Sequence, residues 1–108
     1  MTPEQALVAR LWQRYAGVAA ERVAVLEQLV DAVANGTASV EQLHDARTAA
    51  HKLSGALGTY GRPGSEVARE LEGLLSGGVD LGDVPALVAA LRRCVEPAPA
   101  VVALDTSG

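Results

Sequence analysis

One histidine, set among small residues, is the side chain in this sequence best suited to chemistry. His51 lies in a helix-forming run whose apolar residues gather on one side of a helical wheel, and its own position falls almost opposite them. Around it on the same face lie Arg47, Ser54, Gly55 and Gly58. Because each glycine inside a helix costs about 1 kcal/mol relative to alanine, this grouping indicates that another molecule must approach the imidazole closely.

The elements that position His51 are predicted from helix start and stop signals. Capping-box patterns begin helices after Thr2 and Ser39, and Asp83 precedes the last one. Breaks are expected at Asn35-Gly36, at Gly61, at residues 76–78 and before Pro97. Gly17 is expected to bend or divide the first long segment, which gives five helical segments in all.

Each of these segments carries apolar residues on one side, and the connections between them are short. The predicted fold is therefore all-α: an antiparallel up-and-down four-helix bundle with an additional N-terminal helical segment. The bundle is assigned to residues 1–96. Residues 97–108 read as a linker or tail, or as the start of a following receiver-like α/β domain, because a Pro-Ala stretch precedes a short β-branched run.

Composition limits the functions open to the chain. With 108 residues, 49% of them apolar and no Phe, the sequence predicts one domain with a core of Ala, Val and Leu. A net charge of −4 without a basic cluster argues against nucleic acid, and no run approaches the ~20 apolar residues of a membrane span. Cys94 is expected as a buried filler of the last helix, and a lone cysteine without a signal-peptide pattern indicates a cytoplasmic setting.

The run His51-Lys52-Leu53-Ser54-Gly55, followed by Gly58 and Gly61, resembles the motif of histidine-containing phosphotransfer (HPt) domains of bacterial phosphorelays. Leu71-Glu72 is similar to the Leu-Glu pair on that family's next helix. The chain departs from the motif at Ser54, where most members have Lys. Its connection after Gly61 is one residue shorter than in many members, which predicts that Glu72 falls short of its counterpart's position.

The resemblance implies a phosphoryl carrier, not an autonomous catalyst. In this interpretation His51 is the phosphoacceptor for an aspartyl phosphate on the receiver domain of a response regulator or hybrid kinase, and it passes the group to another receiver. Lys52, Ser54 and Arg47 are the candidates to stabilise the phosphoryl group. The candidates for partner docking are Gly55, Gly58 and Arg62.

No metal and no cofactor are expected on this chain, since Mg²⁺ belongs to the partner receiver, and the domain is expected to be a monomer in isolation. Alternatives stay open: a phosphoacceptor domain of a chemotaxis-type histidine kinase, a helical scaffolding or interaction domain without phosphotransfer, or a degenerate regulator that binds receivers only. Retention of His51 speaks against the last of these.

Overall fold

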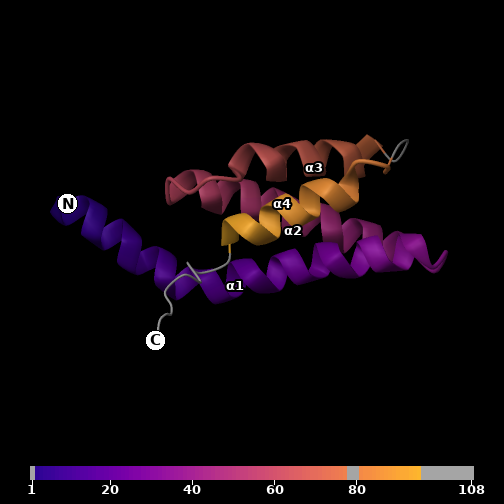
Figure 1. Ribbon diagram of the computed structural model, residues 1–108, viewed down its shortest axis with the longest axis horizontal. Coiled ribbons are helices and arrows are strands. Elements are labelled where there is room, and N and C mark those ends of the chain that lie inside the picture. The colour runs from indigo at the N-terminus through magenta and orange to yellow at the C-terminus, as the bar shows by residue number, and fades with distance from the viewer. Residues whose placement is uncertain (1, 78–80, 96–108) are drawn as a thin grey trace, which may run out of the picture.

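The computed structural model describes residues 2–77 and 81–95, and these residues form four helices. They are α1 (Pro3–Ala34), α2 (Val40–Thr59), α3 (Ser65–Gly77) and α4 (Val84–Val95). Each helix packs against its neighbours in the order α1–α2–α3–α4, and α4 closes the ring against α1 (Figure 1). The described part of the chain contains no strand, so the predicted all-α bundle is confirmed.

Local sequence determines where the first two helices begin and end. The side chains of Thr2 and Ser39 each accept a hydrogen bond from the backbone N–H three residues on. In return, the side-chain oxygens of Gln5 and Gln42 accept a hydrogen bond from the backbone N–H of the cap residue. The turn after α1 uses the left-handed conformation at Gly36 (φ 70°). Gly61 (φ 63°) does the same after α2, so both predicted stop signals are confirmed.

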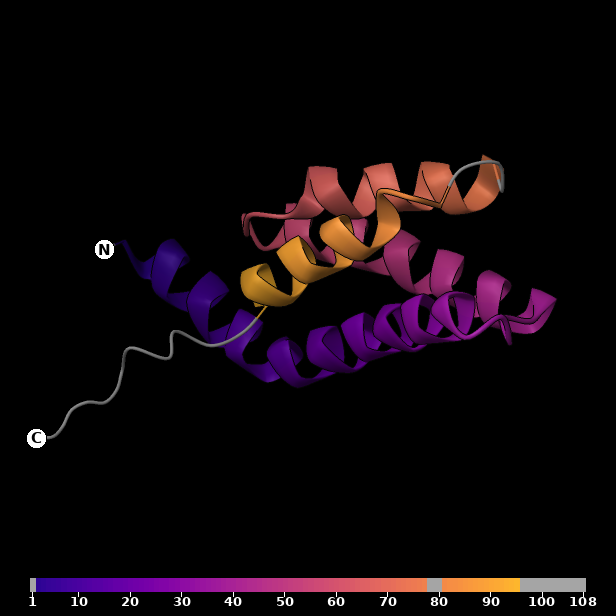
Figure 2. The same ribbon diagram turned by 45° about the vertical axis from the view of Figure 1, so that its right-hand side comes forward.

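Of the two outcomes expected at Gly17, a bend or a division, the division is wrong, because α1 runs without interruption from Pro3 to Ala34. The cost of one helical glycine, about 1 kcal/mol, is smaller than the gain from packing the turns on both sides of it. The predicted additional N-terminal segment is therefore the first part of α1. It extends past the ends of the other helices, at an angle to the rest of α1 (Figure 2).

The core consists almost entirely of Leu, Val and Ala from all four helices, as the composition predicts. Small residues dominate the buried side of α2, where Ala46, Ala49 and Ala50 let neighbouring helices approach. At one end Trp12 packs edge-on to Tyr60, with ring centroids 5.8 Å apart. This end of the core lies at the C-terminus of α2, where the first turns of α1 leave the bundle.

Two contacts fix α4 and the α2–α3 turn. Arg92 of α4 donates two hydrogen bonds to the carboxylate of Glu27 in α1, at 3.0 and 2.7 Å. Cys94 of α4 is half-buried instead of fully buried, and it faces Gly64 in the turn between α2 and α3. A Cβ at Gly64 would stand only 3.1 Å from the Cys94 sulfur, so the turn needs glycine both for this approach and for its φ of 104°.

The expected linker, tail or strand after residue 96 lies outside the described residues.

Candidate functional site

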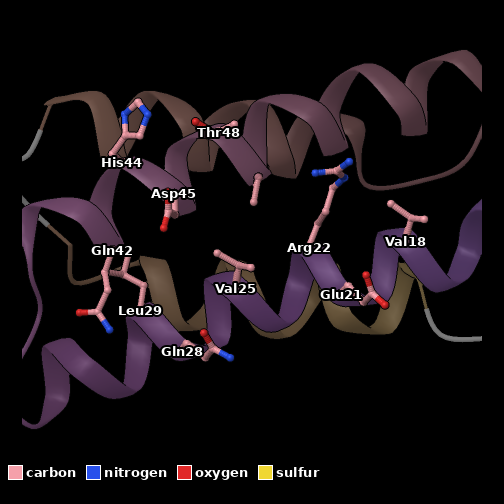
Figure 3. A pocket seen from close by; sticks show the side chains of 11 residues that line it. Val18, Glu21, Arg22, Val25, Gln28, Leu29, Gln42, His44, Asp45 and Thr48 are labelled. Atoms are coloured by element: carbon pink, nitrogen blue, oxygen red, sulfur yellow. The ribbon is translucent and has the colours of Figure 1, made fainter.

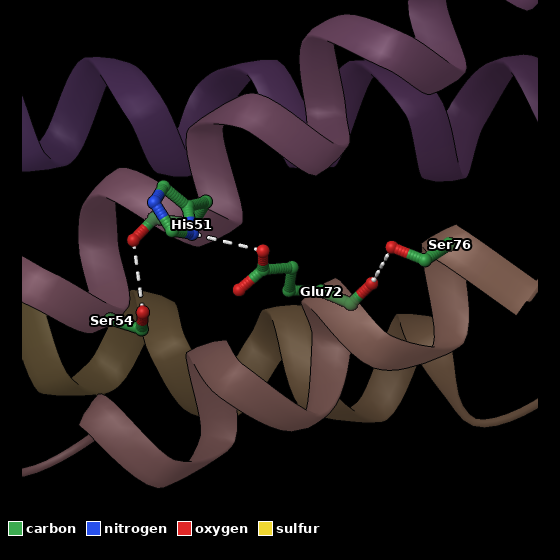
Figure 4. Close-up of polar contacts among 4 residues, drawn as sticks. All are labelled: His51, Ser54, Glu72 and Ser76. Carbon is green, nitrogen blue, oxygen red and sulfur yellow. Dashed lines mark hydrogen bonds and ion pairs between the residues drawn. The ribbon is translucent and has the colours of Figure 1, made fainter.

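His51 projects from the middle of α2 into solvent, at the seam between α2 and α3. Its side chain is 70% exposed, whereas Ala50 and Leu53 beside it are fully buried. The side of the ring that faces α3 meets Glu72, whose Oε2 lies 2.9 Å from Nδ1 (Figure 4). An exposed imidazole is thus held by one partner across the seam.

The contact with Glu72 favours one tautomer of the neutral ring. An ionised carboxylate can only accept a hydrogen bond, so Nδ1 must be the nitrogen that carries the proton. In the neutral imidazole this leaves the lone pair on Nε2, the nitrogen not engaged by Glu72. The arrangement therefore presents Nε2 to solvent as the nucleophile, while the carboxylate of Glu72 contacts the opposite ring nitrogen, Nδ1.

The contact of Glu72 with His51 was not predicted from the sequence. The expected shortfall of Glu72 rested on the length of the connection after Gly61, whereas the reach of Glu72 depends on how α3 lies along α2. Ser65 begins α3 directly after the turn, and Leu71 is buried in the core, which leaves its neighbour Glu72 at the edge of the seam. The signal that could have found the contact is the Leu-Glu pair itself.

The three residues expected to stabilise a phosphoryl group take different positions. Lys52 is exposed and makes no hydrogen bond or ion pair within residues 2–77 and 81–95. Arg47 places its guanidinium 3.3 Å from Nδ1 of His44, one turn before it. Ser54 donates its hydroxyl to the backbone carbonyl of His51 at 2.9 Å (Figure 4). Of the three, Lys52 alone is a free cation next to His51 in sequence.

The expected docking residues also differ in what surrounds them. A Cβ at Gly55 would meet nothing within 4 Å, and one at Gly58 would lie 3.9 Å from the hydroxyl of Ser65. Arg62 packs its guanidinium over Trp12, 4.7 Å from the ring centroid, and its Nε is buried without a partner. Arg62 therefore supports the end of the core, whereas the chain's own packing gives no reason for glycine at Gly55.

A groove with a volume of about 450 Å³ lies between α1 and α2. Figure 3 shows Arg22 extending into it from α1 and Asp45 facing it from α2. Its lining carries charges of both signs among apolar side chains and includes none of the residues predicted for the site. This groove is separate from the His51–Glu72 pair and defines no ligand class of its own.

The fold and the site define a class of protein: a small helical bundle that offers one exposed, carboxylate-supported histidine. The Hpt domain family matches residues 10–100 of the chain. The chain therefore belongs to the Hpt family, whose members carry a phosphoryl group on a histidine in phosphorelays and interact with receiver domains. Comparisons with curated proteins and with solved structures find no match. Within the described ranges, no helix is long and apolar enough to span a membrane.

Proposed function

We propose that His51 accepts a phosphoryl group from the aspartyl phosphate of a receiver domain and passes it to a second receiver. In the first step Nε2 attacks phosphorus, a P–N bond forms, the P–O bond to the aspartate breaks, and the receiver carboxylate leaves. The observation that carries the proposal is the contact of Nδ1 with Glu72 at 2.9 Å, on a ring that is 70% exposed. The second transfer reverses these bond changes on another aspartate.

Glu72 assists the step by stabilising charge. When Nε2 takes the phosphoryl group, the ring keeps its proton on Nδ1 and becomes positively charged. The carboxylate of Glu72 lies where that charge develops, in the way that an acidic residue supports the histidine of a catalytic triad. This chain supplies the nucleophile and its support. Mg²⁺ on the partner receiver supplies neutralisation of the phosphoryl oxygens.

The surface around His51 suits a protein partner. Gly55 lies one turn beyond His51, and space is open where its side chain would stand. The chain's own fold gains nothing from a glycine here, and its helix loses about 1 kcal/mol. We attribute this cost to a partner surface that packs against α2, with Gly58 and Arg62 further along it. Lys52 is the residue we assign to the phosphoryl oxygens, ahead of Arg47 and Ser54, whose polar groups contact other atoms.

We place this transfer in the cytoplasm, the compartment that a single cysteine favours. Incubation with phosphorylated receivers tests the transfer directly. Phosphorylated receivers from the same organism are incubated with the wild type and with His51→Gln. We expect an acid-labile, base-stable label on the wild type only. A label on both proteins would refute the assignment of His51.

A second incubation distinguishes the proposed relay from the alternative, a phosphoacceptor domain of a chemotaxis-type histidine kinase. It offers the chain ATP together with the ATP-binding kinase domain of such an enzyme, in place of a phosphorylated receiver. We expect no label from this mixture and rapid label from a receiver. Label from the kinase domain alone would assign the chain to a histidine kinase. Label from neither source would leave a scaffolding or receiver-binding domain.

A further inference from the structure

The first turns of α1 carry an apolar surface that no other helix covers. They extend past the ends of α2, α3 and α4, as Figures 1 and 2 both show. Leu7 is 52% exposed there and Leu11 is 39% exposed, and Val8 is also exposed. Large apolar side chains grouped on one short stretch of helix, and not scattered singly, mark a surface that binds something.

The spacing of these residues is that of a helix-pairing seam. Glu4, Leu7, Leu11 and Arg14 follow one another at intervals of three, four and three, and all four are exposed. We call this set the α1 stripe. Alternating steps of three and four are the repeat by which two helices pack side by side, with the central positions apolar. The stripe therefore fits another helix.

We propose that the occupant of the α1 stripe is the same stripe of a second copy of this chain, in antiparallel orientation. Charge complementarity supports this choice. When two stripes run in opposite directions, Leu7 of each copy faces Leu11 of the other, and Glu4 faces Arg14. Two copies of each contact form, because the pairing is two-fold symmetric. Within the described ranges neither Glu4 nor Arg14 forms an ion pair in its own chain.

The parallel orientation is disfavoured by the same residues. It would set Glu4 against Glu4 at one end of the seam and Arg14 against Arg14 at the other, and like charges in facing positions repel. The antiparallel pairing covers about three helical turns, a contact in the range of weak and transient interfaces. The dimer is therefore a weak one, and it departs from the monomer expected from the sequence.

Sedimentation of the full chain measures the association. As the concentration rises from about 1 μM to about 1 mM, we expect the average mass of the wild type to rise from 11.1 kDa toward twice that value. Leu11→Gln removes an apolar side chain from both halves of the seam and should weaken the dimer at least about tenfold. Val40→Gln, at an apolar residue that is 85% exposed on another helix, is the matched control and should dimerise as the wild type does.

A charge swap tests the orientation. Glu4→Arg alone and Arg14→Glu alone each place like charges opposite one another and should weaken the dimer. The double variant restores opposite charges in the antiparallel pairing, so its dimer should form again. Circular dichroism and phosphoryl uptake from the small donor phosphoramidate verify that each variant is folded. A wild type that stays monomeric throughout, or a double variant that does not recover, would overturn the proposal.

A receiver domain seated on the α1 stripe is the competing outcome. It predicts a wild type and a Leu11→Gln variant that are both monomeric at every concentration. It also predicts that Leu11→Gln slows transfer from a receiver but leaves uptake from phosphoramidate unchanged. This combination of results would replace the second copy by the receiver as the occupant.

Discussion

The carboxylate of Glu72 contacts Nδ1 of His51, so a variant without this carboxylate keeps the nucleophile and loses only its support. Glu72→Gln keeps the size of the side chain but removes the charge that stabilises a phosphorylated ring. We expect phosphoryl uptake from phosphoramidate to slow by about 10- to 100-fold, the range seen when a carboxylate that orients a metal-bound histidine is lost. Rates of label incorporation measure this change.

The matched control for Glu72→Gln is Glu70→Gln, since Glu70 is an exposed acid on the same helix. It lowers the net negative charge by the same amount, without touching the contact to His51. We expect its uptake rate to equal that of the wild type. Equal rates for both variants would show that the carboxylate of Glu72 contributes nothing to the reaction.

Gly55 tests whether a protein must approach α2 closely. Gly55→Gln adds a side chain into open space, so the bundle should keep its helical content and gain up to about 1 kcal/mol in stability. We expect transfer from a phosphorylated receiver to be abolished and uptake from phosphoramidate to persist, because only the larger donor is obstructed. Gly17→Gln, also in open space but on α1, is the control. Full transfer from the receiver to Gly55→Gln would rule out close docking here.

At the scale of the helices, the Glu27–Arg92 pair joins the first helix to the last. The hydrogen bond from Arg92 holds the pKa of Glu27 below its ordinary value of 4.5. Partial burial of the carboxylate raises this pKa, and the positive charge of Arg92 lowers it further. Because the pKa is lower in the folded chain, the unfolded chain binds more protons as the pH falls. The stabilisation is complete above about pH 4.5 and is lost as the pH drops through the lowered pKa.

Glu27→Gln should therefore lower the melting temperature at neutral pH and have little effect in acid. The carboxylate is 42% exposed, so screening by water limits the loss to less than about 1 kcal/mol. Thermal unfolding followed by circular dichroism at neutral and acid pH measures it. Glu21→Gln, an exposed acid on the same helix, should show no such pH-dependent difference. A deficit for Glu27→Gln that is as large in acid as at neutral pH would contradict the ion-pair interpretation.

The helices differ in how much of them the sequence could predict. Both capping boxes and the glycine stops are local, since each depends on residues within one turn, and they were predictable at Ser39 and Gly61. The contact of Glu72 with His51 joins residues 21 apart in sequence and depends on how α3 slides along α2. Continuity of α1 through Gly17 likewise follows from tertiary packing and not from local propensity.

For the molecule as a whole, the small residues of α2 determine how close the helices stand. Ala50 is fully buried directly next to His51, so its size fixes the distance from the histidine-bearing helix to its neighbours. Ala50→Leu forces extra methylene groups into a filled core, which should cost about 1–3 kcal/mol of folding stability. Ala89→Leu, at an exposed position of α4, should leave stability nearly unchanged. Denaturant unfolding of both variants measures the difference.

The same substitution should also alter the site, because the seam between α2 and α3 holds the contact of His51 with Glu72. If Ala50→Leu pushes these helices apart, the gap of 2.9 Å between Nδ1 and Oε2 lengthens and the carboxylate loses its hold on the ring. Phosphoryl uptake should then fall toward the rate of Glu72→Gln, while the double variant should be no slower than Glu72→Gln alone. Additive losses in the double variant would show that core packing and the carboxylate support act independently.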